Sequence, residues 1–340
     1  MRAAIFHGPN QPLKIEAVEM PKIGPDEILV KVAACGVCHT DLSYIDHGVP
    51  TFKKPPLILG HEPSGTVERV GDKVTDFKAG DRVVLPAVLT CGKCAYCRTG
   101  RENICLNMVM YGNHVDGAYA EFVKAPAKDA LHLPDEIPLI EGCIIADAIS
   151  TPYHAVKNRG EVKPGDSVVV IGCGGVGINV VQIAAAIGAS VIAVDILPGK
   201  LEWAKKLGAV ETINAKEVED VGKAIRRLTG GGADVAFEVI GNPATIEQAF
   251  GCVKGGGRLV VVGYTHKDIS VNAGRIMFRE MEIIGSLGCR PIDYVKLIEM
   301  VRIGKIKVKE LVTEKFSLKD INGAFDVLRK GESLRTIVTP

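Results

Sequence analysis

The sequence predicts an α/β protein of two domains, one a barrel-like, mostly antiparallel β-domain and the other a doubly wound parallel sheet. Its 340 residues are enough for about two domains of ordinary size. Short apolar runs broken by Gly, Pro and Asp dominate the N-terminal part, whereas apolar runs alternate with helical segments from Asp166 onward. We expect the β-domain at 1–150, the parallel-sheet domain at 151–287, and a return of 288–340 to the first domain.

Composition and charge limit the kind of protein. Hydrophobic residues make up 47% and charged residues 24%, which is typical of folded globular chains. Lys and Arg number 41 against 40 Asp and Glu, so the net charge of +1 offers no field for nucleic acid or anionic lipid. The N-terminus lacks the apolar core of a signal peptide, and no apolar run reaches the ~20 residues of a membrane span. We therefore expect a cytoplasmic protein without nucleic-acid or membrane partners.

The β-domain pattern extends to about Pro126. Apolar runs such as ILVKVAACG, GTVERVGD, DRVVLPAV and AYAEFVKAP are bounded by turn-forming residues. This rhythm stops over 140–158, where Ser150, Thr151 and Pro152 mark a helix start. After Gly288, two helices near DYVKLIEMVRIG and INGAFDVLRKG and a last strand in SLRTIVTP predict the return to the first domain.

Four cysteines gather in the segment CGKCAYCRTGRENIC at 91–105. Cys91, Cys94, Cys97 and Cys105 have the spacing Cys-x2-Cys-x2-Cys-x7-Cys, and four thiolates this close in sequence can complete a tetrahedral zinc site. The alternatives are unpaired thiols in a loop and an iron–sulfur cluster, whose common cysteine spacings are different. The segment therefore predicts a structural zinc site with no open coordination position.

The second domain opens on a glycine-rich turn. Runs such as SVVVIG, VIAVD, DVAFEVIG, RLVVVG and MEIIGS have the pattern of buried strands, and Gly172-x-Gly174-x-x-Gly177 lies between the first strand and the helical run that follows. In a dinucleotide site such glycines allow a tight turn, an approach of backbone to pyrophosphate and close helix–strand packing, with the helix N-terminus facing phosphate. The expected cofactor contacts are Gly172, Gly174, Gly175, Val176 and Gly177.

An acidic residue ends the second strand of this domain. Asp195 lies 18 residues beyond Gly177, where a carboxylate can accept hydrogen bonds from an adenosine ribose and would repel a 2′-phosphate. The alternative is an ordinary turn residue at the end of a strand. The pattern favours NAD over NADP.

Two further segments, CGVCHTDLS at 35–43 and GHEPSG at 60–65, supply metal-binding residue types. Taken alone, Cys38 is a small buried hydrophobe and His61 a core histidine. Together with the cysteine segment that follows, they resemble the zinc-containing medium-chain dehydrogenase/reductase superfamily, especially its alcohol dehydrogenases, over essentially the whole chain. The resemblance implies a GroES-like catalytic domain with a structural zinc lobe, and a Rossmann domain that binds NAD.

The resemblance also implies a catalytic zinc ion. Its ligands would be Cys38, His61 and Asp147, the last from the segment DAISTPYHA. Cys143, one helical turn earlier, is an alternative third ligand because either residue type can bind zinc, and Glu62 is a neighbouring or interchangeable ligand. With the structural ion, this gives two zinc ions per chain.

Three protein ligands leave one position for water or substrate, and zinc there would lower the pKa of a bound alcohol. Asp41 matches the family carboxylate that orients the ligating histidine. Thr40 matches the hydroxyl that accepts the alcohol proton. In many relatives a histidine continues this route, but the position is Ser43 here, so the route ends on Ser43 and water or uses another group.

More of the cofactor site follows from the same resemblance. The added residues are Lys200 near the ribose, Val239, Ile240, Gly263 and Tyr264 along the nicotinamide, and His39 and Arg335 at the pyrophosphate. For an isolated Arg or His, a solvated surface position is the alternative.

We therefore expect an NAD-dependent zinc alcohol dehydrogenase that oxidises an alcohol reversibly to a ketone or aldehyde. Ala87 stands where relatives often carry a bulky pocket residue, which predicts room for secondary, cyclic or branched alcohols. The alternatives are a polyol dehydrogenase, a zinc-free quinone or enoyl reductase, which would lack these ligands, and a zinc-ribbon scaffold, which would not need the dinucleotide motif. Relatives of this length imply a homotetramer or homodimer.

Overall fold

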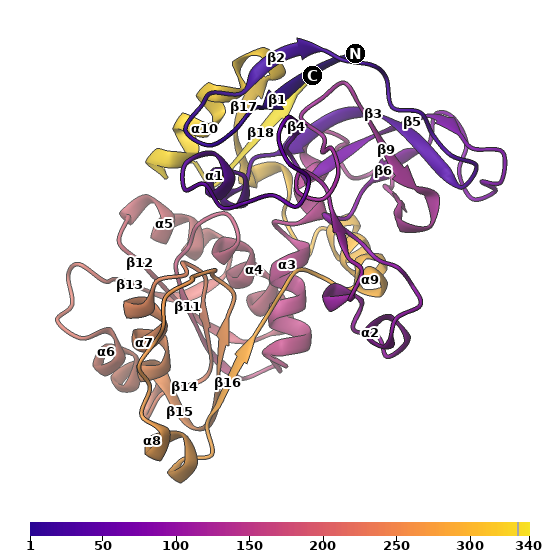
Figure 1. Cartoon of the computed structure of the whole chain (residues 1–340). Coiled ribbons are helices and arrows are strands. Elements are labelled where there is room, and N and C mark those ends of the chain that lie inside the picture. Colours follow the sequence, from indigo (N-terminus) through magenta and orange to yellow (C-terminus); the bar gives the residue numbers. More distant parts are fainter. Residues whose placement is uncertain (332) are drawn as a thin grey trace. The chain divides into compact units, whose positions relative to one another are not determined.

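The computed structural model describes residues 1–331 and 333–340. The chain divides into two units, Met1–Ser150 together with Gly288–Pro340, and Thr151–Leu287. Figure 1 shows the yellow C-terminal strands β17 and β18 in the same unit as the indigo N-terminal strands. Within the described residues, no helix is long and apolar enough to cross a membrane.

One large sheet forms the body of the first unit. Its strand order is β10-β6-β5-β3-β18-β17, and β9 also pairs with β3. β18 runs antiparallel to β3, with Val338 opposite Cys35, so segments far apart in the sequence are neighbours in the sheet. The strands are β3 (Glu27–Gly36), β5 (Pro63–Val70), β6 (Arg82–Val84), β9 (Phe122–Pro126), β10 (Leu131–His132), β17 (Val312–Ser317) and β18 (Arg335–Thr339).

Two smaller sheets complete the strands of this unit. β1 pairs with both β2 and β4, and β7 pairs with β8. Their strands are β1 (Arg2–Phe6), β2 (Lys14–Ala17), β4 (Leu57–Ile58), β7 (Val88–Leu89) and β8 (Val109–Met110). The alternating apolar side chains of β3, among them Ile28 and Val30, are buried in one core with Tyr119 and Phe325.

The first helix of the first unit is short and positions a candidate ligand. Cys38 has extended backbone and its sulfur accepts the Thr40 amide at 3.5 Å, so it caps the helix that follows. The helices are α1 (His39–Ile45), α2 (Ala95–Arg98), α9 (Pro291–Arg302) and α10 (Ile321–Lys330), with 3-10 turns at Glu102–Ile104, Ala127–Asp129, Glu141–Ala146, Lys309–Leu311 and Leu318–Asp320.

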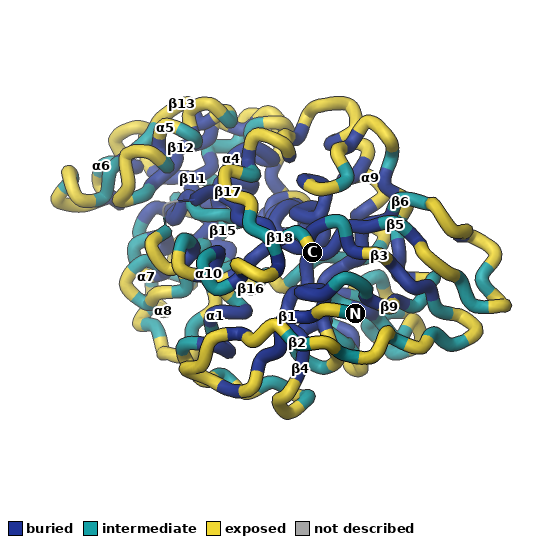
Figure 2. The backbone as a smooth tube through the Cα atoms, turned by 90° about the horizontal axis from the view of Figure 1, so that it is seen from above, coloured by how far each residue is buried: buried dark blue, intermediate teal, exposed yellow. Residues whose placement is uncertain are grey.

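The second unit is built on a six-stranded, all-parallel sheet with the order β13-β12-β11-β14-β15-β16. Figure 2 shows buried backbone along β11 and β12, as expected for strands covered on both faces. The strand order reverses between β11 and β14, and ligands bind such sheets at the carboxyl ends beside that reversal. The strands are β11 (Ser167–Ile171), β12 (Ser190–Asp195), β13 (Ala209–Asn214), β14 (Ala233–Glu238), β15 (Val253–Val261) and β16 (Glu282–Gly285).

The remaining helices of the described residues are one that precedes β11 and five that follow strands of the second unit along the chain. They are α3 (Ser150–His154), continued by the π-helical turn Ala155–Arg159, and α4 (Gly177–Ile187), α5 (Pro198–Lys206), α6 (Val221–Thr229), α7 (Pro243–Cys252) and α8 (Ala273–Phe278). The predicted α/β fold class is confirmed. The patterns did not indicate β13 or β17, because each lies partly exposed and alternates weakly between apolar and polar residues.

Candidate active site

Four side chains from three separate segments of the first unit meet at one place. One ligand atom each from Cys38, His61, Glu62 and Asp147 lies within 4.8 Å of the others. Cys38 caps α1, His61 and Glu62 lie just before β5, and Asp147 follows the 3-10 turn Glu141–Ala146. The structure thus brings together the three predicted ligands and their acidic neighbour.

His61 is the clearest sign that this group binds a cation. Its ring is 1% exposed, and neither ring nitrogen has a hydrogen-bond partner among the described residues. Nδ1 lies 3.5 Å from Asp41 Oδ1 and Nε2 lies 3.6 Å from Asp147 Oδ2. Burial favours the neutral ring, but Asp41 and Asp147 outweigh it and raise the pKa of His61 above its ordinary value.

The donor set fits zinc. Cys38 Sγ lies 4.0 Å from Asp147 Oδ2, so sulfur, imidazole nitrogen and carboxylate oxygen face one small space. These are the three ligand types that zinc takes, and an ion there would satisfy the buried nitrogen that otherwise has no partner.

Glu62 is held by an arginine from the C-terminal strand. Glu62 is fully buried, Arg335 is 5% exposed, and the two form an ion pair between the guanidinium Nη2 and Oε2. The other oxygen of Glu62, Oε1, is buried without a partner among the described residues. The contact of Arg335 with a pyrophosphate therefore stays a prediction, because the residue already has a partner beside the metal-binding group.

The alternative third ligand does not join the group. Cys143 is fully buried, but its sulfur is not among the atoms that lie within 4.8 Å of one another, in the part of the chain that the structure describes. Asp147, rather than Cys143, faces Cys38 and His61.

The predicted proton route begins on α1. Thr40 is half-buried in the first turn, beside Cys38. Ser43 donates its hydroxyl proton to the carbonyl of His39 at 3.1 Å, and His39 itself is exposed. Because the proton of Ser43 is used within the helix, its place in the route stays a prediction.

The cysteine lobe has the dimensions of a closed site. The sulfur–sulfur separations are 3.5 Å for Cys94 and Cys97, 3.8 Å for Cys94 and Cys105, and 3.9 Å for Cys91 and Cys97. Four sulfurs bonded to zinc at ~2.3 Å form a tetrahedron with edges of about 3.8 Å. The amides of Lys93 and Cys94 lower the pKa of the Cys91 thiol to about 6, which favours the thiolate.

The glycine-rich turn of the second unit has the shape of a phosphate cradle. Gly172 has a φ of +94°, and Gly177 packs on its carbonyl so closely that no side chain fits. A Cβ at Gly174 would meet only Lys200 Nζ, at 3.9 Å, so this part of the turn is open. The N-terminus of α4 follows directly, after Gly175 and the capping Val176.

Asp195 holds this turn in place. Its Oδ2 accepts the Cys173 amide at 2.7 Å, and its Oδ1 accepts the amides of Ile196 and Leu197 at 2.7 and 3.0 Å. A carboxylate has about four acceptor positions, so room remains for one ribose hydroxyl.

The residues predicted along the nicotinamide lie in two loops that touch. Gly241, with a φ of +82°, and Gly263 pack backbone to backbone with no space for a Cβ, which places Ile240 and Gly241 against Gly263 and Tyr264. Glu238 organises the first loop: it is fully buried and accepts the amides of Ile240 and Gly241 at 3.0 and 2.9 Å. Sequence reasoning missed Glu238, because in FEVIG it has the position of an ordinary strand residue.

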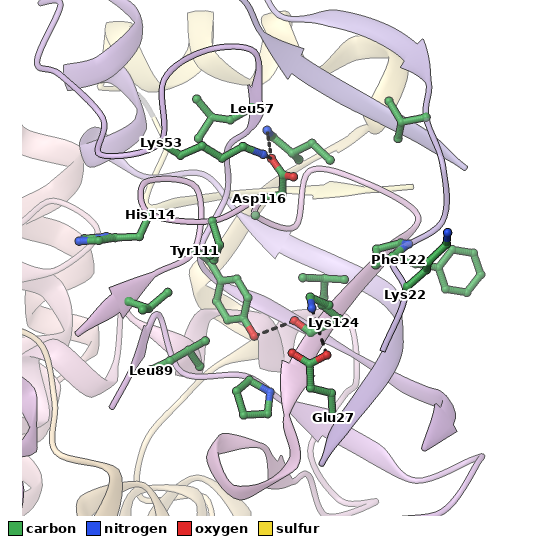
Figure 3. Close-up of a pocket in the computed structure, with 18 of the residues that line it drawn as sticks. Lys22, Glu27, Lys53, Leu57, Leu89, Tyr111, His114, Asp116, Phe122 and Lys124 are labelled. Carbon is green, nitrogen blue, oxygen red and sulfur yellow. Dashed lines mark hydrogen bonds and ion pairs between the residues drawn. The ribbon is translucent and has the colours of Figure 1, made fainter. Parts of the chain in front are cut away.

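A separate cavity of about 990 Å³ lies elsewhere in the first unit. Tyr111, Lys124 and Glu27 line it, as Figure 3 shows. Cys38, His61 and Asp147 are not among its lining residues. The metal-binding group is therefore identified by its side chains and not by the size of a cavity.

Comparison with known proteins gives the family. The model "Alcohol dehydrogenase GroES-like domain" matches residues 24–135, and the model "Zinc-binding dehydrogenase" matches residues 175–302. An alcohol dehydrogenase of Geobacillus stearothermophilus is 38% identical over 98% of this chain and 97% of its own length. A sorbitol dehydrogenase of Bacillus subtilis is 36% identical over 100% and 97%.

A solved structure agrees with these sequences. The 2R,3R-butanediol dehydrogenase of Bacillus subtilis matches with a TM-score of 0.91 and 30% identity, over 100% of this chain and 99% of its own. The predicted enzyme class, zinc and NAD are thereby confirmed, and the protein is a zinc-dependent oxidoreductase that acts on alcohols. The chain belongs to the zinc-containing alcohol dehydrogenases of the medium-chain dehydrogenase/reductase superfamily.

Proposed function

We propose that the enzyme oxidises secondary alcohols, including cyclic and branched ones, to ketones, with Cys38, His61 and Asp147 holding the catalytic zinc ion. The observation that carries the ligand assignment is the buried His61 ring, whose nitrogens lack hydrogen-bond partners beside a thiol and a carboxylate. When bound, zinc supplies a Lewis acid that acidifies the substrate hydroxyl, and NAD supplies the hydride acceptor.

The side chains around the ligands position them and handle the proton. Asp41 faces His61 Nδ1 and fixes which ring nitrogen is left for the metal. The Thr40 hydroxyl, two residues after Cys38 in the chain, accepts the proton of the alcohol as it passes its own proton on. Arg335 neutralises Glu62, so that this second carboxylate adds less negative charge to the site.

Cofactor binding is assigned to the second unit. The open turn at Gly174, with Lys200 beside it and the N-terminus of α4 behind it, receives the pyrophosphate. Asp195 accepts the ribose hydroxyl, and its negative charge disfavours the phosphate of NADP.

The substrate class rests on the pocket and on the relatives. Ala87 is small and buried, which supports a pocket with room for a carbon on each side of the carbinol. Sorbitol and butanediol, named for two similar proteins, both carry secondary hydroxyls. A polyol dehydrogenase is therefore the second candidate.

The same proposal includes a homo-oligomer, a homotetramer or a homodimer, as the family resemblance implies. It also includes a cytoplasmic location. The ten cysteines all lie in the described residues and none forms a disulfide there, which suits a reducing compartment.

A panel of NAD-coupled oxidations tests the substrate class. Propan-2-ol and cyclohexanol should give kcat/KM values at least tenfold above that of propan-1-ol, and metal analysis of the same sample should give two zinc ions per chain. Turnover of primary alcohols alone would contradict the proposal. Turnover of sorbitol or xylitol at rates above propan-2-ol would favour the polyol dehydrogenase.

A further inference from the structure

We propose that Tyr119 is a positioning residue for the catalytic metal, acting through Asp41 on His61. The inference rests on the proposed ligation of zinc by His61. It adds a tyrosine, from the loop before β9, to the carboxylate and imidazole that the sequence already predicted.

The three side chains form one buried line. The Tyr119 hydroxyl donates to Asp41 Oδ2 at 2.8 Å, and the other oxygen of Asp41, Oδ1, lies 3.5 Å from His61 Nδ1. Tyr119 and Asp41 are 0% exposed and His61 is 1% exposed. Because all three side chains are shielded from solvent, water does not compete for these contacts, and the orientation of each side chain depends on the next.

The Tyr119 hydroxyl donates its proton to Asp41. The hydroxyl oxygen also lies 3.1 Å from the carbonyl of Gly36, but a phenol has one proton to donate. The shorter contact is to a charged acceptor, which makes the stronger hydrogen bond. Burial and the nearby Asp41 raise the pKa of Tyr119 well above its ordinary value, so the hydroxyl remains a donor at working pH.

The ring of Tyr119 also supports the backbone that carries His61. A Cβ at Gly60 would lie 2.8 Å from the ring, so the glycine directly before the ligand packs flat on the tyrosine. The amide of Tyr119 donates to Leu59 O at 3.0 Å, and Phe325 contacts the ring edge-on at 5.9 Å between centroids. The ring, the backbone amide and the hydroxyl of Tyr119 thus each contact a residue that helps to position His61.

The charge on Asp41 explains why the hydroxyl matters. Asp41 is fully buried, and its Oδ1 lies 3.5 Å from Nδ1 of His61. Tyr119 and the Gly60 amide, at 3.3 Å from Oδ1, are its neutral donors. Without the hydroxyl, Oδ2 would be a buried charged oxygen without a donor, and the carboxylate would gain by rotating away from His61.

A buried tyrosine with a purely structural role is the competing explanation, and Tyr111 provides the matched control. Tyr111 is 1% exposed and donates to the carbonyl of Lys124 at 3.0 Å (Figure 3). Its hydrogen bond is 3.0 Å long and part-buried, against 2.8 Å and buried for Tyr119, and it does not lead to a predicted ligand. Tyr119→Phe and Tyr111→Phe each remove one hydroxyl oxygen from a buried tyrosine ring.

The experiment measures how fast zinc leaves the holoenzyme. Each variant is mixed with a chromogenic chelator, and the release of each of the two ions is followed over time. Tyr119→Phe should lose one zinc ion about tenfold faster than the unmodified enzyme, in the range seen when support of a metal-binding histidine is removed. Tyr111→Phe should release both ions at the unmodified rate. Cobalt-substituted Tyr119→Phe should also show a shifted visible absorption band, whereas cobalt-substituted Tyr111→Phe should not.

The outcomes separate this inference from the function on which it rests. Two results overturn the inference alone, provided that His61→Ala loses one zinc ion. One is an equal rate of zinc release from Tyr119→Phe and the unmodified enzyme. The other is an equal acceleration of zinc release in both tyrosine variants. A His61→Ala variant that keeps both ions overturns the ligand assignment and the inference with it.

A double-mutant cycle adds a second test. If Tyr119 acts through Asp41, Tyr119→Phe should not accelerate zinc release further in an Asp41→Asn background. Full additivity of the two changes would show that Tyr119 acts by another route and would overturn the inference.

Discussion

The cysteine lobe takes its four sulfurs from residues 91–105, whereas Cys38 and Asp147 of the candidate catalytic group lie 109 positions apart in the chain. The lobe is partly exposed, with only Cys105 fully buried, while His61 of the catalytic group is 1% exposed. The lobe offers four identical donors, and the catalytic group offers sulfur, nitrogen and oxygen.

These differences predict that one zinc ion stabilises the fold and the other takes part in catalysis. A local set of ligands can bind metal with little help from the rest of the fold, so the ion stabilises the segment that holds it. A set from distant segments is brought together by the fold, so the ion there adds reactivity more than it adds stability. Loss of the two ions should therefore have different consequences.

The largest expected effect is on catalysis. Asp147→Asn should lower kcat/KM by about a thousandfold, because the lost Lewis acid is worth several kcal/mol in the transition state. One zinc ion per chain should be lost while the melting temperature changes little, as metal analysis and thermal unfolding can check. Full activity in this variant would show that the third zinc ligand is Cys143 or Glu62 and not Asp147.

The next effect should be on stability. Cys97→Ser opens the closed site, and we expect the melting temperature to fall by roughly 10 °C because a structural ion contributes to folding. At 20 °C the variant should keep kcat/KM within about twofold of the unmodified enzyme. An activity loss as large as that of Asp147→Asn would break the comparison between the two sites.

A smaller effect would sharpen the ligand assignment. Cys143→Ala removes a fully buried sulfur, which should cost about 1 kcal/mol and lower the melting temperature by about 2 to 4 °C. Two zinc ions per chain should remain, since Cys143 lies outside the ligand group. Retention of only one ion would show that Cys143 binds zinc.

The smallest effect concerns a charge pair that belongs to neither site. Arg329 donates to both oxygens of Asp46 at 2.8 Å and holds the pKa of Asp46 below its ordinary value. Because the pKa of Asp46 is lower in the folded chain than in the unfolded chain, its charged carboxylate stabilises the fold at pH values above the unfolded pKa. This stabilisation is lost as the pH falls through the pKa of the folded chain. Asp46→Asn should lower the melting temperature by about 1 °C at pH 7, and the gap should close below about pH 4. A difference in melting temperature that stays constant with pH, or a change in zinc content, would contradict this prediction.

Local features of the molecule could be predicted from the sequence. The cysteine lobe and the glycine-rich turn each occupy one short segment, so their spacing alone carries the geometry. The fold class follows for the same reason, since alternating strands and helices are local patterns.

Contacts between distant segments that the family resemblance did not imply could not be predicted. The ion pair of Glu62 with Arg335 exists because β18 lies beside β3, and no pattern in either segment indicates the other. Tyr119 lies 78 positions from Asp41 in the chain and resembles any core residue of a strand. Glu238 could not be recognised until the loop that it holds was visible.

The pairing of β18 with β3 also sets an order of assembly during synthesis. All four sulfurs of the cysteine lobe are available once residue 105 has left the ribosome, so that lobe can take up its ion on the nascent chain. The strand that carries Arg335 is translated long afterwards, and β3 lacks its neighbour until then. Glu62, beside the candidate catalytic ligands, therefore gains its ion-pair partner Arg335 only after the whole cysteine lobe has been made.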